Sequence, residues 1–147
     1  MQKFEPRFVR RAQIFLCDFE ACCNKSDCTI CHPGFSANIK PEIGKVRPVV
    51  IVRPHKRHRL ALAVPFTTQR PTKEVSYTVE IPLGVMPGKL RHNKCWALCD
   101  MVSVVNLARL QRVYRQDLQE SFIGLDYYKE IIAKIHKNIG SADLSKI

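Results

Sequence analysis

The chain has 147 residues, of which 46% are hydrophobic, and this length allows one well-packed core but not two ordinary domains. It contains no apolar run near the roughly 18 residues that cross a bilayer, and its start lacks the apolar core of a signal peptide. We therefore expect a single domain over residues 1–147, in the cytoplasm and away from membranes. Lys and Arg outnumber Asp and Glu by 24 to 13, and the net charge of +11 favours a polyanionic partner such as nucleic acid or an acidic protein.

The first predicted strand covers residues 10–19 and carries apolar side chains on both faces, which indicates a largely buried strand. Residues 20–40 lose this pattern and are rich in Cys, Asn, Ser, Asp, Pro and Gly, which is the composition of a long loop. Loops of that length are usually functional or held by a metal. We interpret residues 20–40 as a cysteine-rich insertion within the domain.

Four further strands are predicted at residues 46–52, 60–66, 75–81 and 95–105. Pro48 is expected near the start or at an edge of its strand, because proline cannot donate a ladder hydrogen bond. A strongly basic connection, residues 53–59, joins the strands at 46–52 and 60–66. Asp100 and Ser103 interrupt the apolar pattern of the last strand.

The rest of the chain predicts helical structure. Asn106 is suited to cap a short helical turn over residues 107–110. Apolar residues recur at spacings of three and four between positions 125 and 139, which predicts a helix that packs one face on a sheet and ends at Gly140. Strands followed by a terminal helix, without a βαβ rhythm, predict a mainly β fold, a small SH3-like barrel with appended helices.

Two polar groups at strand ends carry candidate chemistry. Arg47 offers a planar fork of donors that can hold or protonate a phosphodiester. The hydroxyls of Thr67 and Thr68, followed by Gln69, can donate to charge that develops on phosphoryl oxygens. The structural alternative is an Arg47–Glu42 ion pair and two threonines that close a turn. The sequence has no GxxxxGK, HExxH or GxSxG motif, which argues against P-loop, zincin and hydrolase-elbow chemistry.

Asp100 is a third candidate. A carboxylate within an apolar strand costs free energy unless it is paired or hydrogen-bonded. We consider it either a general base or a structural anchor.

Three segments resemble the MazF/PemK toxin family. Residues 42–51, E-I-G-K-V-R-P-V-V-I, are similar to its segment E-x-x-G/K-x-R-P-V-V-V, and residues 64–69, V-P-F-T-T-Q, are similar to V-P-x-T-T-Q. Residues 97–103, A-L-C-D-M-V-S, resemble A-D/C-D-Q-V-x-S. The resemblance extends over residues 12–140 and implies a homodimeric barrel of the CcdB/PemK type, the toxin of a type II toxin-antitoxin system.

The resemblance also implies an activity, the sequence-specific cleavage of single-stranded RNA such as mRNA without a catalytic metal or other cofactor. The 2'-hydroxyl of the RNA would attack the phosphorus and leave a 2',3'-cyclic phosphate. In this chain Arg47 would be the general acid/base or phosphate clamp, and Thr67 would stabilise the phosphorane. Thr68 and Gln69 would contact the RNA, and an acidic antitoxin would be the protein partner.

In some relatives an acid at the place of Asp100 acts with an arginine two residues earlier. Here Leu98 occupies that earlier position, so the resemblance assigns the main roles in the mechanism to Arg47 and Thr67. Two alternatives to a ribonuclease stay open. One is a non-catalytic protein of this fold that binds a protein target such as gyrase, and the other is a zinc-stabilised RNA-binding module.

The basic connection is suited to follow an RNA backbone. Each cation that neutralises a phosphate releases counterions and makes binding depend on salt. The predicted contacts are Arg53, Lys56, Arg57 and Arg59. We interpret His55 and His58 as surface residues.

The seven cysteines are an odd number, and in a reducing cytoplasm they are not expected to form a disulfide framework. Cys28 and Cys31 have the C-x-x-C spacing that holds zinc, with Cys22 or Cys23 and either His32 or Cys17 completing four ligands. Structural zinc and free, redox-sensitive thiols both stay open. Four protein ligands would leave no open position for water, so the zinc would be structural.

Overall fold

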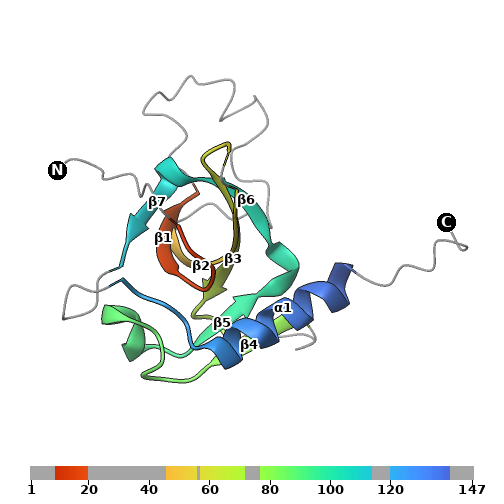
Figure 1. Cartoon of the computed structure of the whole chain (residues 1–147). Helices are drawn as coiled ribbons and strands as arrows, with labels where there is room; N and C mark the ends of the chain where they lie inside the picture. Colours follow the sequence, from red (N-terminus) through yellow and green to blue (C-terminus); the bar gives the residue numbers. More distant parts are fainter. Residues whose placement is uncertain (1–8, 20–45, 56, 72–76, 114–119, 140–147) are drawn as a thin grey trace, which may run out of the picture.

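The computed structural model describes residues 9–19, 46–55, 57–71, 77–113 and 120–139 (Figure 1). Within these residues the chain forms strands, short 3-10 helices and one α-helix. In chain order they are β1 (Ile14–Asp18), β2 (Val46–His55), β3 (Leu60–Thr67), β4 (Thr78–Ile81), η2 (Gly88–His92), β5 (Cys95–Leu98), η3 (Cys99–Met101), β6 (Ser103–Asn106), η4 (Leu107–Arg109), β7 (Leu110–Arg112) and α1 (Leu125–Ile139).

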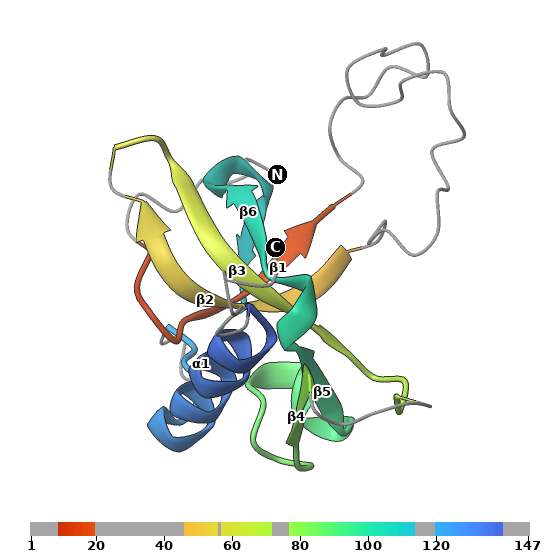
Figure 2. The same ribbon diagram turned by 90° about the vertical axis from the view of Figure 1, so that its right-hand side faces the viewer.

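The sheet is built around β2. This strand pairs antiparallel with β1 on one edge and with β3 on the other. The second edge of β3 pairs with β6 along its first half and with β5 at its end, while β7 pairs with β1. Because β6 continues through η4 into β7, the strands curl around a common interior, with α1 outside it (Figures 1 and 2). The mainly β, barrel-like fold with a C-terminal helix is confirmed.

Alternation along the strands produces two apolar cores. The inner core lies inside the curled sheet and contains Phe15, Cys17, Val49, Ile51, Ala61, Ala63, Val105, Leu107 and Leu110. The outer core lies between the sheet and α1 and includes Ile14, Val50, Val52, Val64, Phe66, Ile131 and Ile135. The middle of β2 is therefore buried on both faces, which explains its unbroken β-branched sequence.

The C-terminal helix packs on the outer core as predicted. Ile131 and Ile135 are buried, whereas Leu125 and Ile139 at the helix ends are 63% and 70% exposed. The Tyr128 hydroxyl donates to the Val52 carbonyl at 2.8 Å, and Lys134 Nζ donates to the Thr78 carbonyl at 2.7 Å. These two bonds attach α1 to β2 and β4. Gly140, its predicted stop, lies outside the described residues.

Several boundaries differ from the sequence prediction. The strand expected over 95–105 is two strands separated by η3, because β5 pairs with the end of β3 and β6 with its beginning. Strand β2 extends to His55 because hairpin pairing continues to Leu60. The first strand begins later than expected, after a turn in which Ala12 has φ 67°. The three-residue strand β7 was not predicted.

Two local predictions are confirmed. Pro48 is the third residue of β2, before the first pair with β3, so its missing N–H removes no bond to that neighbour. Asn106 caps η4, because its side-chain oxygen accepts a hydrogen bond from the Ala108 backbone N–H at 2.9 Å.

Three cysteines of the described part are buried: Cys17, Cys95 and Cys99. Burial raises the pKa of Cys17 to about 12, although the charge of Arg109 acts in the opposite direction. Burial likewise raises the pKa of Cys99 to about 12 and raises that of Cys95. These thiols are neutral packing groups at ordinary pH.

We expect Ile131→Ala to lower the free energy of unfolding by about 2–5 kcal/mol, because it leaves a cavity between α1 and the sheet. The exposed Ile139 provides the matched control, and Ile139→Ala is expected to change stability by less than about 0.5 kcal/mol. Urea denaturation followed by circular dichroism measures both values. Equal losses in the two variants would show that α1 does not pack as described.

The raised thiol pKa values predict that stability falls with pH above the ordinary thiol value of 9.0. There the unfolded chain loses thiol protons while the folded chain keeps them, so unfolding is favoured progressively towards pH 12. Urea midpoints at a series of pH values measure the slope. The Cys17→Ala/Cys99→Ala variant should show a shallower decline than the wild type, and an unchanged slope would contradict the assignment.

Candidate functional site

Arg47 lies at the beginning of β2, where that strand pairs with the end of β1. Its cross-strand partner is Cys17, and paired residues project their side chains to the same face, here the inner one. Arg47 is half-buried, and its Nε atom is buried with no hydrogen-bond partner among the described residues. A buried donor without an acceptor costs free energy, which an oxygen of a bound ligand would recover.

Thr67 is the last residue of β3 and lies at the same end of the β2–β3 pair as Arg47. The last pair between β2 and β3 is Val49 with Pro65, and Arg47 and Thr67 each lie two residues beyond it at the same end. Side chains two positions apart on a strand lie on the same face of the sheet, so the side chains of Arg47 and Thr67 lie on the inner face, as do those of Val49 and Pro65. Beyond this pair β3 leaves β2 and pairs Thr67 with Trp96 of β5. The two polar groups of the sequence thus lie at the same end and on the same face of the sheet, on strands that no longer pair there.

The turn after β3 serves two purposes. Thr67 Oγ1 accepts a hydrogen bond from the Gln69 backbone N–H at 3.2 Å, so the turn expected as the structural alternative is present. This bond uses the hydroxyl oxygen as an acceptor and leaves its proton available for donation. Thr67 is half-buried, whereas Thr68 and Gln69 are exposed. Closing a turn and binding a phosphate are therefore compatible roles.

Asp100 occupies a different position from the one expected. It is exposed in η3, between β5 and β6, and not buried in a strand. Strands β5 and β6 pair with one edge of β3, and β2 pairs with the other edge. The backbones of β5 and β6 are therefore two strand spacings, about 10 Å, from the backbone of β2. The structure therefore does not pair Asp100 directly with Arg47, and the expected cost of burying its carboxylate does not arise.

The basic connection is an exposed hairpin at the other end of β2. Arg53, Arg57 and Arg59 are all exposed, and Lys56 lies outside the described residues. His55 lies eight positions after Arg47 in β2, which corresponds to as much as about 26 Å along the strand. The predicted RNA contacts thus fall into two groups, Thr68 and Gln69 near Arg47 and the hairpin arginines far from it.

A bulge turns the hairpin residues outward. The register between β2 and β3 shifts between Ile51 and Arg53, so Arg53 opposes Leu62 instead of continuing the inner face of Arg47 and Ile51. A one-residue shift moves the following side chains to the other face of a sheet. Arg53 and His55 consequently lie on the outer face.

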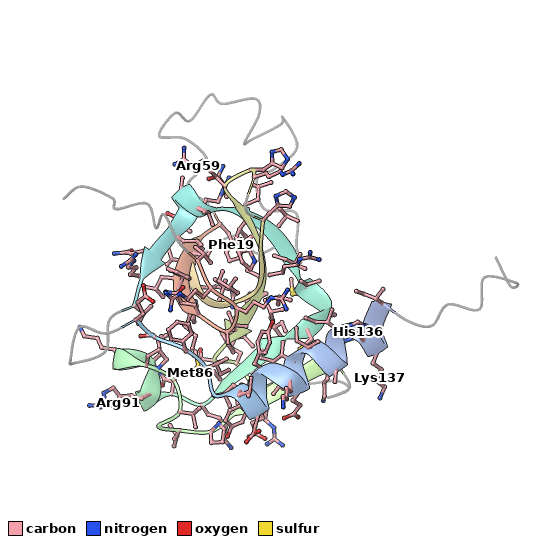
Figure 3. All side chains as sticks on the ribbon, viewed as in Figure 1. Phe19, Arg59, Met86, Arg91, His136 and Lys137 are labelled. Atoms are coloured by element: carbon pink, nitrogen blue, oxygen red, sulfur yellow. The ribbon has the colours of Figure 1, made fainter. Side chains whose placement is uncertain are left out.

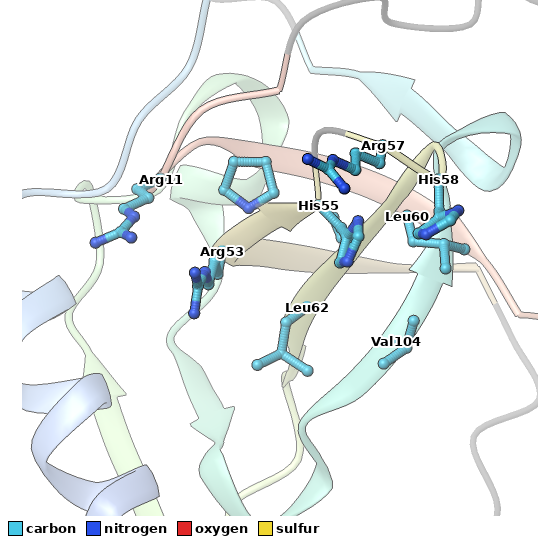
Figure 4. A pocket seen from close by; sticks show the side chains of 10 residues that line it. Arg11, Arg53, His55, Arg57, His58, Leu60, Leu62 and Val104 are labelled. Carbon is cyan, nitrogen blue, oxygen red and sulfur yellow. The ribbon is translucent and has the colours of Figure 1, made fainter.

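These outward residues line a groove of about 1160 Å³ at the hairpin, which we call the hairpin groove (Figure 4). The His55 and His58 rings lie beside each other with centroids 4.8 Å apart. The full lining comprises Arg11, Arg53, Pro54, His55, Arg57, His58, Leu60, Ala61, Leu62 and Val104. Sequence reasoning missed Arg11, Leu60, Leu62 and Val104 as site residues, because no local pattern shows that β1, β3 and β6 meet there.

The candidate zinc ligands Cys22, Cys23, Cys28, Cys31 and His32 lie outside the described residues, as does Glu42. Among the residues that the structure does describe, no group of three or more His, Cys, Asp or Glu side chains could hold a metal. In the same part of the chain, no helix is long and apolar enough to span a membrane.

Comparison with known proteins identifies the family. The family model of the PemK-like, MazF-like toxin of type II toxin-antitoxin systems matches residues 10–137. Among solved structures, the Mycobacterium tuberculosis toxin MazF-mt6 is 15% identical, covering 64% of this chain and 85% of its own with a TM-score of 0.46. A search of curated proteins finds no match. Because the family model spans most of the sequence, the chain belongs to the PemK-like, MazF-like toxin family of type II toxin-antitoxin systems.

Proposed function

We propose that this toxin is a ribonuclease that cleaves single-stranded RNA at the end of the barrel that carries Arg47 and Thr67. The observation that carries the proposal is the half-buried guanidinium of Arg47, whose buried Nε has no acceptor among the described residues and which shares an end and a face with Thr67. A permanent cation and a hydroxyl proton on the same face can both donate to the oxygens of a phosphodiester.

The proposed reaction uses the RNA's own nucleophile. The 2'-hydroxyl oxygen forms a bond to phosphorus, the bond to the 5'-oxygen breaks, and the products are a 2',3'-cyclic phosphate and a 5'-hydroxyl. Arg47 stays protonated, so we assign it to holding the phosphoryl oxygens and to donating a hydrogen bond to the leaving 5'-oxygen, which takes its proton from water. The Thr67 hydroxyl donates to the charge that develops on the phosphoryl oxygens.

The proton of the 2'-hydroxyl requires a separate acceptor. Asp100 is the acid that we test for this role, although it lies across β3 from Arg47 and is exposed. We assign Thr68 and Gln69 to contacts with nucleotides next to the scissile bond, and the hairpin arginines to long-range attraction of the RNA backbone.

The family implies an antitoxin partner. We propose that this antitoxin is acidic, which the net charge of +11 supports, and that the toxin acts as a homodimer in the cytoplasm.

The test is cleavage of a long single-stranded RNA in EDTA, with analysis of the product ends. We expect Arg47→Ala and Thr67→Val each to slow cleavage by about 10²–10³-fold, because each removes a donor to the charge that develops on the phosphoryl oxygens. Asp100→Asn should slow cleavage less than Arg47→Ala does, because Asp100 is exposed and lies across β3 from Arg47. Lys137→Ala, which removes a cation at the exposed end of α1, is the matched control and should cleave like the wild type (Figure 3).

Cleavage that persists undiminished in Arg47→Ala would reject the site. A wild type that cleaves no RNA would instead favour the non-catalytic alternatives, either binding of a protein such as gyrase or binding of RNA without cleavage. Circular dichroism of each variant establishes that it is folded.

We also propose one structural zinc ion per chain in the cysteine-rich segment, held by Cys28 and Cys31 together with Cys22 or Cys23 and His32. Elemental analysis of protein purified under reducing conditions should find about one zinc per chain. Cys28→Ser/Cys31→Ser should lose it, whereas Cys95→Ser should retain it because Cys95 is buried in the outer core. A wild type with less than about a tenth of a zinc per chain would contradict the proposal and leave free thiols.

A further inference from the structure

A row of three side chains crosses the sheet at the end of β3. Thr67 of β3 is paired with Trp96 of β5, and Trp96 is paired in turn with Glu80 of β4. Directly paired residues of antiparallel strands project their side chains to the same face. The neighbouring row packs in the outer core, on the side of α1, and comprises Phe66, Ala97 and Val79. Because side chains alternate along a strand, the row of Thr67, Trp96 and Glu80 lies on the face that points away from α1 (Figure 2).

The far end of this row carries an ion pair. Lys94 Nζ lies 2.7 Å from a carboxylate oxygen of Glu80, and both side chains are about half exposed. The hydrogen bond and the charge of Lys94 lower the pKa of the Glu80 carboxyl, and the charge of Arg70 acts in the same direction. Glu80 is therefore ionised at neutral pH. The two cations offset the repulsion between its carboxylate and the phosphates of an RNA.

Trp96 sets the distance between the two ends of the row. It is only 9% exposed, so its indole is a packed spacer between Thr67 and Glu80 and not a stacking surface for bases. The backbones of β3 and β4 are two strand spacings, about 10 Å, apart. The reach of a nucleotide from its phosphate to the far edge of its base is of the same order. A nucleotide whose phosphate contacts Thr67 can therefore present its base to Glu80.

We propose that Glu80 and Lys94 form a guanine subsite, which binds the Watson–Crick edge of a base next to the scissile phosphate. The Glu80 carboxylate accepts hydrogen bonds from the N1–H and the 2-amino group of guanine, and the Lys94 ammonium donates to its 6-oxygen. The bond between the two side chains leaves enough acceptor and donor positions for these contacts. The inference rests on the proposed function, because it takes Thr67 as a contact of the scissile phosphate.

The other bases match this ion pair less completely. Adenine and cytosine each present one amino group beside an acceptor nitrogen, so the carboxylate gains a single donor. Uracil has one N–H between two carbonyls, and a carbonyl oxygen would face the second carboxylate oxygen. Guanine alone has two adjacent donors for the carboxylate and, beside them, an acceptor for the ammonium group. The ion pair therefore favours guanine and disfavours uracil most strongly.

The test is fluorescence anisotropy of the full chain with labelled heptanucleotides. Their riboses are 2'-O-methylated, so that no 2'-hydroxyl is free to start cleavage. One has a single central guanine among uracils, the second has inosine at that position, and the third has only uracil. We expect the wild type to bind the guanine oligonucleotide at least about tenfold more tightly than the uracil one. It should prefer guanine to inosine, which lacks the 2-amino group, by at least about fivefold.

Glu80→Gln keeps the shape of the side chain and removes one of the two acceptor oxygens. This variant should bind the guanine and inosine oligonucleotides within about twofold of each other. Glu130→Gln is the matched control, since Glu130 is also exposed but belongs to α1, and it should keep the preference of the wild type. A wild type that binds guanine and uracil oligonucleotides equally would overturn the proposal. So would a Glu80→Gln variant that still prefers guanine to inosine.

Cleavage of an RNA pool of random sequence separates this subsite from the catalytic site. The wild type should favour guanine at one position beside the cut. Glu80→Gln should lose that preference and cleave the pool at a rate within about threefold of the wild type. A Glu80→Gln rate as low as that of Arg47→Ala would make Glu80 part of the catalytic machinery and would overturn the specificity role. A wild type that cleaves no RNA would contradict the ribonuclease proposal, whereas the binding preference is measured without cleavage and decides the guanine subsite separately.

Discussion

The antiparallel pairing of β2 with both β1 and β3 is the constraint on which the rest of the molecule depends. From Val49 to Val52 this strand is buried on both faces and contributes side chains to both cores. Polar side chains can therefore reach solvent only near its two ends. Arg47 stands at one end and Arg53 and His55 at the other, so the same strand supports the candidate catalytic site and the hairpin groove.

The bulge between Ile51 and Arg53 decides which face each end uses. Side chains alternate with a period of two, so an unbroken register would have aimed Arg53 into the barrel, on the face of Arg47. The shift places Arg53 opposite Leu62 and outward. One backbone irregularity thus keeps a second cation out of the inner core and gives the outer groove its charge.

The surroundings of Arg47 leave its charge available. Its cross-strand neighbour Cys17 is fully buried, and burial raises the pKa of that thiol to about 12. A thiolate at this place would neutralise the guanidinium, but a neutral thiol does not. Arg109 adds a further cation on the same side of the barrel, where its guanidinium donates to the Asp18 and Phe19 carbonyls at 3.2 and 3.3 Å. This end of the barrel is therefore suited to an anion.

The order of the residues was enough to predict the class of fold and the elements with strong local signals. Three such features depend on residues that are near one another in the chain: the periodicity of α1, the Asn106 cap and the β-branched centre of β2. Local preferences of this kind are retained in the folded protein. The polar groups at Arg47 and Thr67 were also visible, because they interrupt apolar runs. Strand pairing and packing set the relations between distant segments: the location of Arg47 and Thr67 at one end of the β2–β3 pair, the division of residues 95–105 into two strands along β3, and the exposure of Asp100. The outward turn of Arg53 and its union with Arg11 and Val104 likewise follow from a register shift and from strand pairing, which no short stretch of sequence encodes.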